Sequence, residues 1–377
     1  MRKLTSPLQL QGLTPAPAQV SGAFRLIPLL RVSPCDDVRL ARSALPAGVK
    51  LVNLPDDSRY VAFVPHGLRL SWGAALGTQV RSQDTPEVPW RSVTVLDKLR
   101  KKEGQDTLHF LPLHLALEGL LALHFAPPRI KWAELSPDFH RWGLGTRQET
   151  GVPGAALPGY DDALRTFELH RGQVGTLVFV ADELAAAFVV PSAEDYHRLH
   201  RTLLDDLYGE LVLRYAVLFP RTPLVQATPH FAGARSLGDL RAGLERMRRE
   251  WADYTQGTLL GDWAERTLRA EPVYRPGKMT LERFVTDLDP AQANHIGERL
   301  VRDDGELLYL KTFRLSAAQT RRAHLLSQLS AHNWNLQQAA VALNTSVPEL
   351  VGRIEAQGFG ALLAQSVRER AAKAWRG

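Results

Sequence analysis

Cysteine is the scarcest residue in this sequence, with Cys35 alone among 377 residues. A single cysteine excludes an intramolecular disulfide and any zinc site built from several cysteines. No run approaches the ~18 uninterrupted apolar residues that a membrane-spanning helix needs. The first residues, MRKLTSPLQLQGLTPAPAQ, lack the apolar centre of a secretion signal. We therefore expect a cytoplasmic protein with no membrane partner, in which Cys35 is a buried small hydrophobe.

Common catalytic and nucleotide-binding motifs are missing as well. The sequence has no G-x-G-x-x-G, no G-x-x-x-x-G-K, no G-x-S-x-G and no H-E-x-x-H. Hydrophobic residues make up 45% and charged residues 23%, which is ordinary for a globular chain long enough for two or more domains. We predict no catalytic residues, no metal and no cofactor.

The clearest pattern lies near the C-terminus, between Asn333 and Phe359. Two series of apolar residues recur there at helical spacing, separated by the break Asn344-Thr345-Ser346. Residues of this break prefer caps and turns, Pro348 suits the first turn of a helix, and Gly358 suits a left-handed C-cap. The pattern predicts a helix, a tight turn and a second helix. With a preceding helix over Ala317 to Leu329, we expect a small all-α domain over residues 311–377.

Charge is unevenly distributed along the chain. The segment from Lys311 to Gly377 holds nine basic residues against three acidic ones, and nine minus three equals the formal net charge of the whole chain, +6. A positive segment beside a predicted helix-turn-helix favours a polyanionic partner, because phosphate contacts supply most non-specific affinity for nucleic acid. The alternative is a solvated basic tail that keeps the protein soluble.

The pattern of the residues before this tail predicts an α+β large domain. For the whole chain we therefore predict an α+β protein with a small all-α domain at its end. We expect a loose arm over residues 1–20 and the large domain over residues 21–310. Its predicted strands are 22–30, 49–55, 59–65 and a hairpin of 174–180 with 185–190. Its predicted helices lie within 36–45, from Ser192 as N-cap, over 237–254 and over 259–269.

Two groups of polar side chains are candidates for chemistry. His66, Arg81, Gln83 and Asp84 lie in or beside a glycine-punctuated stretch, where they could hold a phosphate or carboxylate. The alternative is that Arg81 and Asp84 pair locally and order a loop. His197 and His200 have a spacing that can share a metal, but no third ligand is evident and a polar helix flank explains them equally well.

The segment LLSQLSAHNWNLQQAAVALNTSVPELVGRIEAQGFGAL resembles the Fis-type helix-turn-helix found at the C-terminus of many bacterial regulators. The positions that carry the likeness are His332-Asn333-Trp334-Asn335, Ala339-Ala340, Leu343, Leu350, Ile354 and Gly358-Phe359. The resemblance implies DNA binding and transcription regulation. Family members commonly carry several Arg or Lys in the second helix, whereas this one has Arg353 between Glu349 and Glu355. We therefore expect the flanking helices to supply most phosphate contacts.

Three other stretches resemble the ARG and rhodanese-phosphatase-associated (ARPP) domain. They are FRLIPLL, GLRLSWGAALGTQVRSQDTPEVPW and GQVGTLVFVADELAAAFVVPSAEDYHRLHRTLLDDLYGELVLRYA. This resemblance implies a setting in nucleotide or ADP-ribose metabolism. It transfers no activity to particular residues.

Together these patterns predict a DNA-binding, regulatory protein whose large domain senses a ligand or mediates assembly. The expected partners are double-stranded DNA, a small anionic ligand and a second copy of the chain, since paired half-sites are usual. One alternative is an enzyme acting on a phosphorylated, nucleotide-like or ADP-ribose-like substrate, and another is an interaction protein whose tail packs on another chain. The predicted DNA contacts are Thr345, Ser346, Arg353 and Gln357, with Arg321, Arg322, Arg368 and Lys373 on phosphates.

Overall fold

The computed structural model describes both ends of the chain and a few short segments of the region between residues 43 and 159. The described residues are 2–4, 10–42, 51–53, 59–61, 68–72, 90–92, 108–110, 117, 120–122, 124–125, 160–204, 209, 211, 219–222, 231, 233–264, 266–275 and 277–375. Within these ranges, no helix is both long and apolar enough to cross a membrane.

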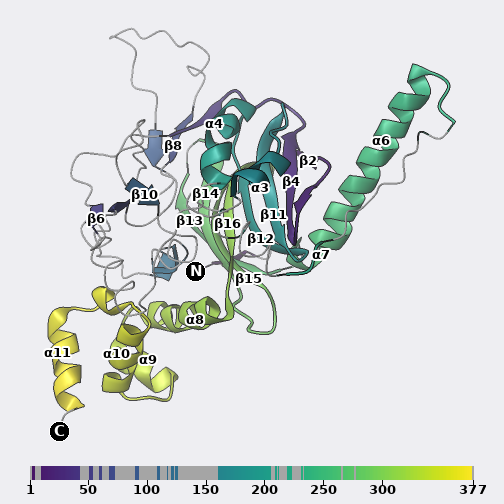
Figure 1. The fold of residues 1–377 in the computed structure, drawn as a ribbon. Coiled ribbons are helices and arrows are strands. Elements are labelled where there is room, and N and C mark those ends of the chain that lie inside the picture. The colour runs from purple at the N-terminus through teal and green to yellow at the C-terminus, as the bar shows by residue number, and fades with distance from the viewer. Residues whose placement is uncertain are drawn as a thin grey trace.

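A ten-stranded sheet, antiparallel throughout, forms the centre of the molecule (Figure 1). Its order is β1-β13-β14-β15-β16-β12-β11-β4-β2, and β3 also pairs with β4. The strands are β1 (Arg2–Leu4), β2 (Leu13–Pro15), β3 (Gln19–Ser21), β4 (Phe24–Arg31), β11 (Gln173–Val180), β12 (Glu183–Val189), β13 (Leu268–Tyr274), β14 (Met279–Thr286), β15 (Asn294–Arg302) and β16 (Leu307–Leu315).

Two smaller sheets of three strands each come from the region between β4 and β11. One has the order β10-β7-β6 and the other β5-β8-β9. The strands are β5 (Val38–Arg42), β6 (Leu51–Asn53), β7 (Arg59–Val61), β8 (Leu68–Trp72), β9 (Trp90–Ser92) and β10 (Leu108–Phe110).

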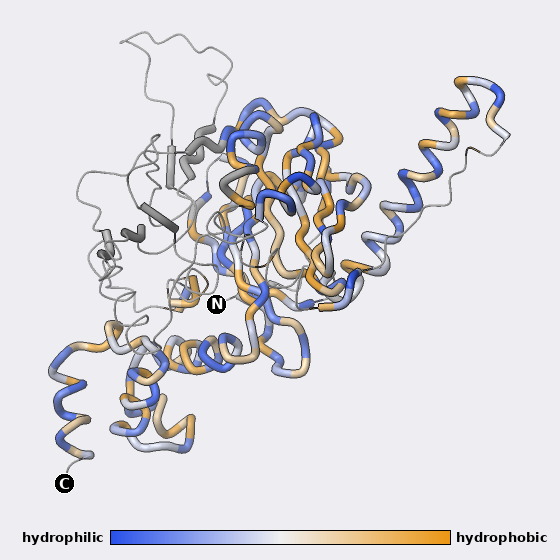
Figure 2. Tube along the Cα trace, viewed as in Figure 1, coloured by the Kyte–Doolittle hydropathy of each residue, from blue (hydrophilic) through white to orange (hydrophobic). Residues whose placement is uncertain are grey.

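The helices follow in two groups. Before the tail they are α3 (Tyr160–Thr166), α4 (Ala193–Leu203), α6 (Leu237–Tyr254), the π-helix η4 (Thr255–Leu259) and α7 (Gly261–Ala264). In the tail they are α8 (Ala317–Ala331), α9 (Leu336–Ala342), α10 (Val347–Ala356), the 3-10 turn η5 (Gly360–Leu362) and α11 (Gln365–Ala374). Figure 1 shows α6 projecting away from the sheet, and Figure 2 shows hydrophobic residues concentrated in the sheet, whereas hydrophilic stretches recur along α6 and α11.

The predicted hairpin is confirmed as β11 and β12. Its two-residue turn, Ala181 and Asp182, has φ values of 49° and 62°, the left-handed pair that matches the twist of two antiparallel strands. Both strands are almost entirely buried, because β4 pairs on one side and β16 on the other. This hairpin therefore joins the N-terminal part of the sheet to the β13–β16 meander.

Each face of the large sheet has its own hydrophobic core. One core holds Phe188 and Phe313 from the sheet and continues into α4, the tail helices and the residues Leu117, Leu120, Leu121, Ala122 and Phe125. The other holds Phe284 and Leu310, packed with Leu259 of η4 and with Trp263 of α7. Side chains alternate between faces along a strand, so Tyr309 and Leu310 of β16 enter different cores.

A row of charged side chains crosses the first of these faces. Arg283, Glu298 and Lys311 occupy paired positions on β14, β15 and β16. Glu298 lies 3.6 Å from Arg283 and 3.4 Å from Lys311. Lys311 is 1% exposed, and burial lowers its pKa, an effect that Glu298 opposes. Lys311 is thus a core residue of the sheet and adds no charge to the surface of the tail.

The tail begins where β16 ends. Only Ser316 separates β16 from α8, and its hydroxyl accepts the amide of Gln319 in a capping box. The predicted helices 317–329, 336–343 and 347–354 are confirmed as α8, α9 and α10 to within two residues at each end. Residues 311–315, which we assigned to the helical domain, lie in β16.

Three other expectations are corrected. Within the loose arm expected over residues 1–20, residues 2–4 form β1, paired with β13, and residues 13–15 form β2, paired with β4. The helix expected within 36–45 is instead strand β5, paired with β8. The helix expected over 259–269 breaks into η4, α7 and the start of β13. For residues 36–45, pairing with β8 outweighs a local helical pattern.

Candidate functional site

Helices α9 and α10 are joined by the four residues from Leu343 to Ser346. Ala339 and Ala340 of α9 and Leu350 and Ile354 of α10 are buried, so the two helices pack through their apolar faces. Asn344 has a φ of 50° and Gly358 a φ of 82°, which puts a residue in left-handed conformation after each helix, as its cap requires. The helix, turn and helix predicted from the sequence are present.

The start of α10 is occupied by its own cap. Ser346 accepts the amide of Glu349, and the Glu349 carboxylate accepts the amide of Ser346 and, at 2.7 Å, the hydroxyl of Thr345. The hydrogen bonds from Thr345 and Ser346 lower the pKa of Glu349, so it stays ionised. Two of the predicted DNA contacts, Thr345 and Ser346, therefore bond to a carboxylate of their own helix.

The other predicted DNA-binding residues differ in exposure. Arg321 of α8, Arg353 of α10 and Lys373 of α11 are exposed. Arg322 is half-buried, and burial lowers its pKa. Arg368 donates to Glu355 at 2.6 Å, which fixes α11 against α10. Gln357 is partly buried, and its Oε1 is buried without a hydrogen-bond partner.

The residues predicted to form a ligand pocket, His66, Arg81, Gln83 and Asp84, lie outside the described residues. The enzyme hypothesis built on them therefore stays a prediction, and turnover and thermal-shift assays of Arg81→Ala with phosphorylated and nucleotide-like compounds test it. The described ranges contain no cluster of three or more His, Cys, Asp or Glu that could hold a metal.

His197 and His200 of α4 do not converge. His200 is buried between the Tyr196 hydroxyl and the Phe167 carbonyl. His197 is exposed and contacts the carbonyl of His170 at 3.3 Å. They act as structural side chains on two sides of one helix.

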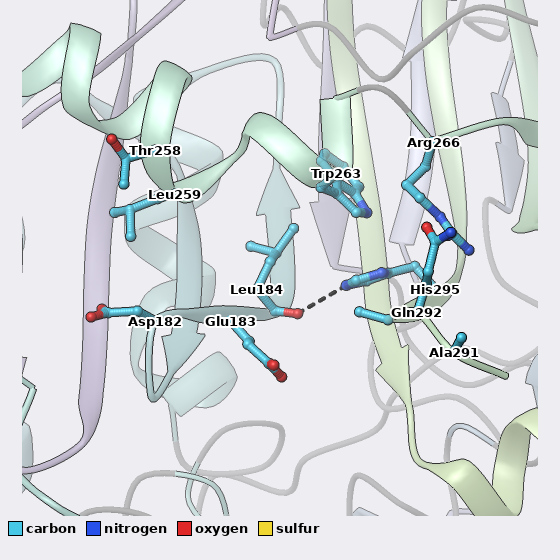
Figure 3. Close-up of a pocket in the computed structure, with 11 residues that line it drawn as sticks. Asp182, Glu183, Leu184, Thr258, Leu259, Trp263, Arg266, Ala291, Gln292 and His295 are labelled. Carbon is cyan, nitrogen blue, oxygen red and sulfur yellow. Dashed lines mark hydrogen bonds between the residues drawn. The ribbon is translucent and has the colours of Figure 1, made fainter. Parts of the chain in front are cut away.

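A cavity of about 600 Å³ opens at the end of the large sheet, between the β11–β12 turn, η4, α7 and the start of β15 (Figure 3). The π-helix continues α6 and ends at Leu259, and such helices are frequent at functional sites. The cavity is lined by Asp182, Glu183, Leu184, Thr258, Leu259, Trp263, Arg266, Ala291, Gln292, Ala293 and His295. Figure 3 shows Trp263, Arg266 and His295 together on one side, with Asp182 and Thr258 on the other.

The imidazole of His295, the second residue of β15, bonds through one of its two nitrogens. Its Nε2 lies 2.9 Å from the carbonyl oxygen of Leu184, and its ring meets the edge of Trp263 with centroids 5.6 Å apart. Burial lowers the pKa of His295 to about 3, and the charges of Arg314 and Arg266 add to this. The ring is therefore neutral.

Arg266 is fixed by two partners. It forms an ion pair with Asp287 and donates to Asn294 Oδ1 at 3.1 Å. Asn294 Oδ1 also accepts the hydroxyl of Thr286 at 2.9 Å, and Asn294 Nδ2 donates to the Gln292 carbonyl at 2.9 Å. This network orients the guanidinium before any ligand arrives.

Comparison with known proteins gives one family. The family model ARPP-2 matches residues 8–277, which is most of the chain. The chain belongs to the ARPP-2 family. No curated protein and no solved structure matches it.

The ARPP-2 match confirms the resemblance of the large domain and marks where it ends. The matched span stops between β13 and β14, so the last three strands of the sheet and the whole tail lie beyond it. Trp263 and Arg266 fall inside the span, and His295 falls outside. We did not predict these three residues, because their positions converge only when β16 pairs with β12 on one side and with β15 on the other.

Proposed function

We propose that this ARPP-2 protein binds double-stranded DNA through its C-terminal helices and that its large domain senses a small ligand. In this proposal α9 and α10 act as a Fis-type helix-turn-helix, with α10 in the major groove. The observation that carries the proposal is the pair itself: two capped helices joined by four residues, packed on their apolar faces, with Arg353 exposed on α10.

The charges on the tail favour phosphate contacts over base recognition. Arg321, Arg353 and Lys373 are exposed on three different helices. Thr345 and Ser346, the polar residues at the start of α10, are engaged by Glu349. We therefore propose binding with modest sequence preference and a strong dependence on salt.

Binding of a labelled duplex to the full-length protein, measured across salt concentrations, tests this function. Arg353→Ala should weaken binding by about 10-fold, and Lys373→Ala should reduce the salt slope by about 1. Glu349→Gln preserves the capping box but removes a negative charge, so it should tighten binding by about 2- to 5-fold at low salt. Arg248→Ala in α6, far from the tail, is the matched control.

A second candidate function follows from exposed apolar side chains on the tail. Val341 is 75% exposed and Trp375 is 66% exposed, and both suit a contact with a second copy of this chain.

Affinity for duplex DNA that is absent, or that does not change with salt, would refute the first proposal. Sedimentation of wild type against Trp375→Ala then reports whether the tail mediates self-association.

A further inference from the structure

The cavity beside Trp263 is lined by hydrogen-bonding atoms that have no partner in the protein. Trp263 Nε1, Arg266 Nε and His295 Nδ1 are all buried and without a hydrogen-bond partner. Their residues are 5%, 8% and 1% exposed. A buried donor or acceptor that is left without a partner destabilises the fold. Three of them around one cavity therefore indicate a molecule that supplies the missing partners.

The hydrogen-bonding roles of the three atoms can be assigned. His295 Nε2 faces the Leu184 carbonyl, so this nitrogen carries the proton and Nδ1 offers a lone pair. Trp263 Nε1 and Arg266 Nε can only donate. A matching ligand must therefore present one donor to His295 and acceptors to Trp263 and Arg266.

Charge and shape narrow the class further. Arg266 is paired with Asp287, Asp182 with Arg25, and Glu183 with Arg314. The charged side chains that line the cavity are thus already neutralised, and the pocket needs no charge on its ligand. Leu184, Leu259 and the indole of Trp263 supply apolar walls, which suit a flat ring system.

We propose that this cavity binds an uncharged planar heterocycle whose edge carries an N–H beside carbonyl oxygens, which is a cyclic amide or imide. The N–H donates to His295 Nδ1, and the carbonyl oxygens accept from Trp263 and Arg266. A volume of about 600 Å³ exceeds what one ring fills, so two or three fused rings fit better than one. The inference gives the sensing role proposed above a ligand class, but it rests on the cavity and needs no DNA binding.

A series of ring compounds tests the proposal by calorimetry on the full-length protein. Uracil, xanthine and lumichrome all carry an N–H between two carbonyls, on one, two and three rings. Affinity should rise along this series, because the added rings contact Trp263 and the leucines. Uracil methylated at both nitrogens, which lacks the donor, should bind at least about 3-fold more weakly than uracil.

Two substitutions test the assigned contacts. Trp263→Phe keeps an aromatic wall and removes the N–H, so lumichrome should bind about 3- to 10-fold more weakly. Arg266→Lys keeps a charge for Asp287 and removes Nε, with a similar expected loss. Trp251→Phe is the control, because Trp251 is equally buried but lies in α6 and outside the cavity. Thermal unfolding of each variant shows whether the fold is retained.

Several results would overturn the proposal. They are the absence of binding across the series, equal binding of uracil and its methylated form, and tighter binding of benzoate or inorganic phosphate than of lumichrome. If the protein does not bind DNA, this test is unaffected, since the calorimetry measures binding of the ring compounds in the absence of DNA. Lumichrome that binds as expected but leaves DNA affinity unchanged supports the cavity and refutes only the sensing role.

Discussion

At the scale of single residues, His124 combines burial with missing partners. Both of its ring nitrogens are buried and have no hydrogen-bond partner, although its ring packs edge-on against Phe125. Burial, and to a smaller extent the charge of Arg283, lowers the pKa of His124 from 6.5 to about 3. Two buried ring nitrogens without hydrogen-bond partners destabilise the folded state.

This predicts how stability depends on pH. Between the folded pKa of about 3 and the unfolded value of 6.5, the unfolded chain binds more protons, so stability falls as pH falls through this window. Lowering the pH from ~7 to ~5 should cost up to about 2 kcal/mol from His124. His124→Leu should raise stability at neutral pH and reduce the loss on acidification. Urea unfolding at both pH values measures this, and an unchanged pH dependence would contradict it.

At the scale of elements, the row Arg283, Glu298 and Lys311 ties three strands together. Glu298 forms ion pairs with both Arg283 and Lys311, whereas within the row each of these two cations pairs with Glu298 alone. Removing one partner of a buried pair leaves an uncompensated charge and costs about 3–5 kcal/mol. The three side chains are therefore not equivalent.

We predict that Glu298→Gln destabilises the fold more than Lys311→Met does. The first change leaves the buried Lys311 and the partly exposed Arg283 without their shared carboxylate, whereas the second leaves the pair Arg283–Glu298 intact. The exposed pair Arg275 and Asp303 gives a control, and Asp303→Asn should change the free energy of unfolding by less than about 0.5 kcal/mol. Chemical denaturation of the three variants ranks them, and equal costs for Glu298→Gln and Lys311→Met would refute the prediction.

Elements with strong local signals were predictable. The hairpin β11–β12 has two apolar runs around a short turn, and α8 to α10 carry clear caps and helical periodicity. In the β13–β16 meander only residues 306–313, ELLYLKTF, have a strand-like sequence, because buried charges such as Glu298 and Lys311 break the hydrophobic pattern of the meander. Strand β5 reads locally as a helix, and only its pairing with β8 decides otherwise. The cavity depends on residues more than a hundred positions apart, so no spacing rule could locate it.

At the scale of the whole molecule, the tail is packed against the sheet. Leu326, Ile354 and Phe359 share one hydrophobic core with Phe188 and Phe313 of the sheet. A separate DNA-binding domain that begins at residue 311 would not need to share a hydrophobic core with the sheet. We infer that a change in the packing of the tail affects the packing of the sheet, and that the reverse also holds.

Trp334 links the tail to Phe125, which belongs to the same hydrophobic core. Its indole N–H donates to the carbonyl oxygen of Phe125 at 2.8 Å. Its φ is 59°, a left-handed conformation that is strained for a bulky residue. Such strain persists where surrounding contacts impose it, and the bond to Phe125 together with packing against the shared core supplies them.

Trp334→Ala should therefore loosen the tail without unfolding the sheet. Amides of α9 and α10 should exchange with solvent faster than in the wild type, while those of β11 and β12 keep their protection. Trp375→Ala should change neither, because Trp375 is 66% exposed. In the wild type, α10 should be protected nearly as well as the central strands, since they share a core. Much faster exchange of α10 than of β11 in the wild type would instead show that the tail folds independently, as the boundary expected at residue 311 implies.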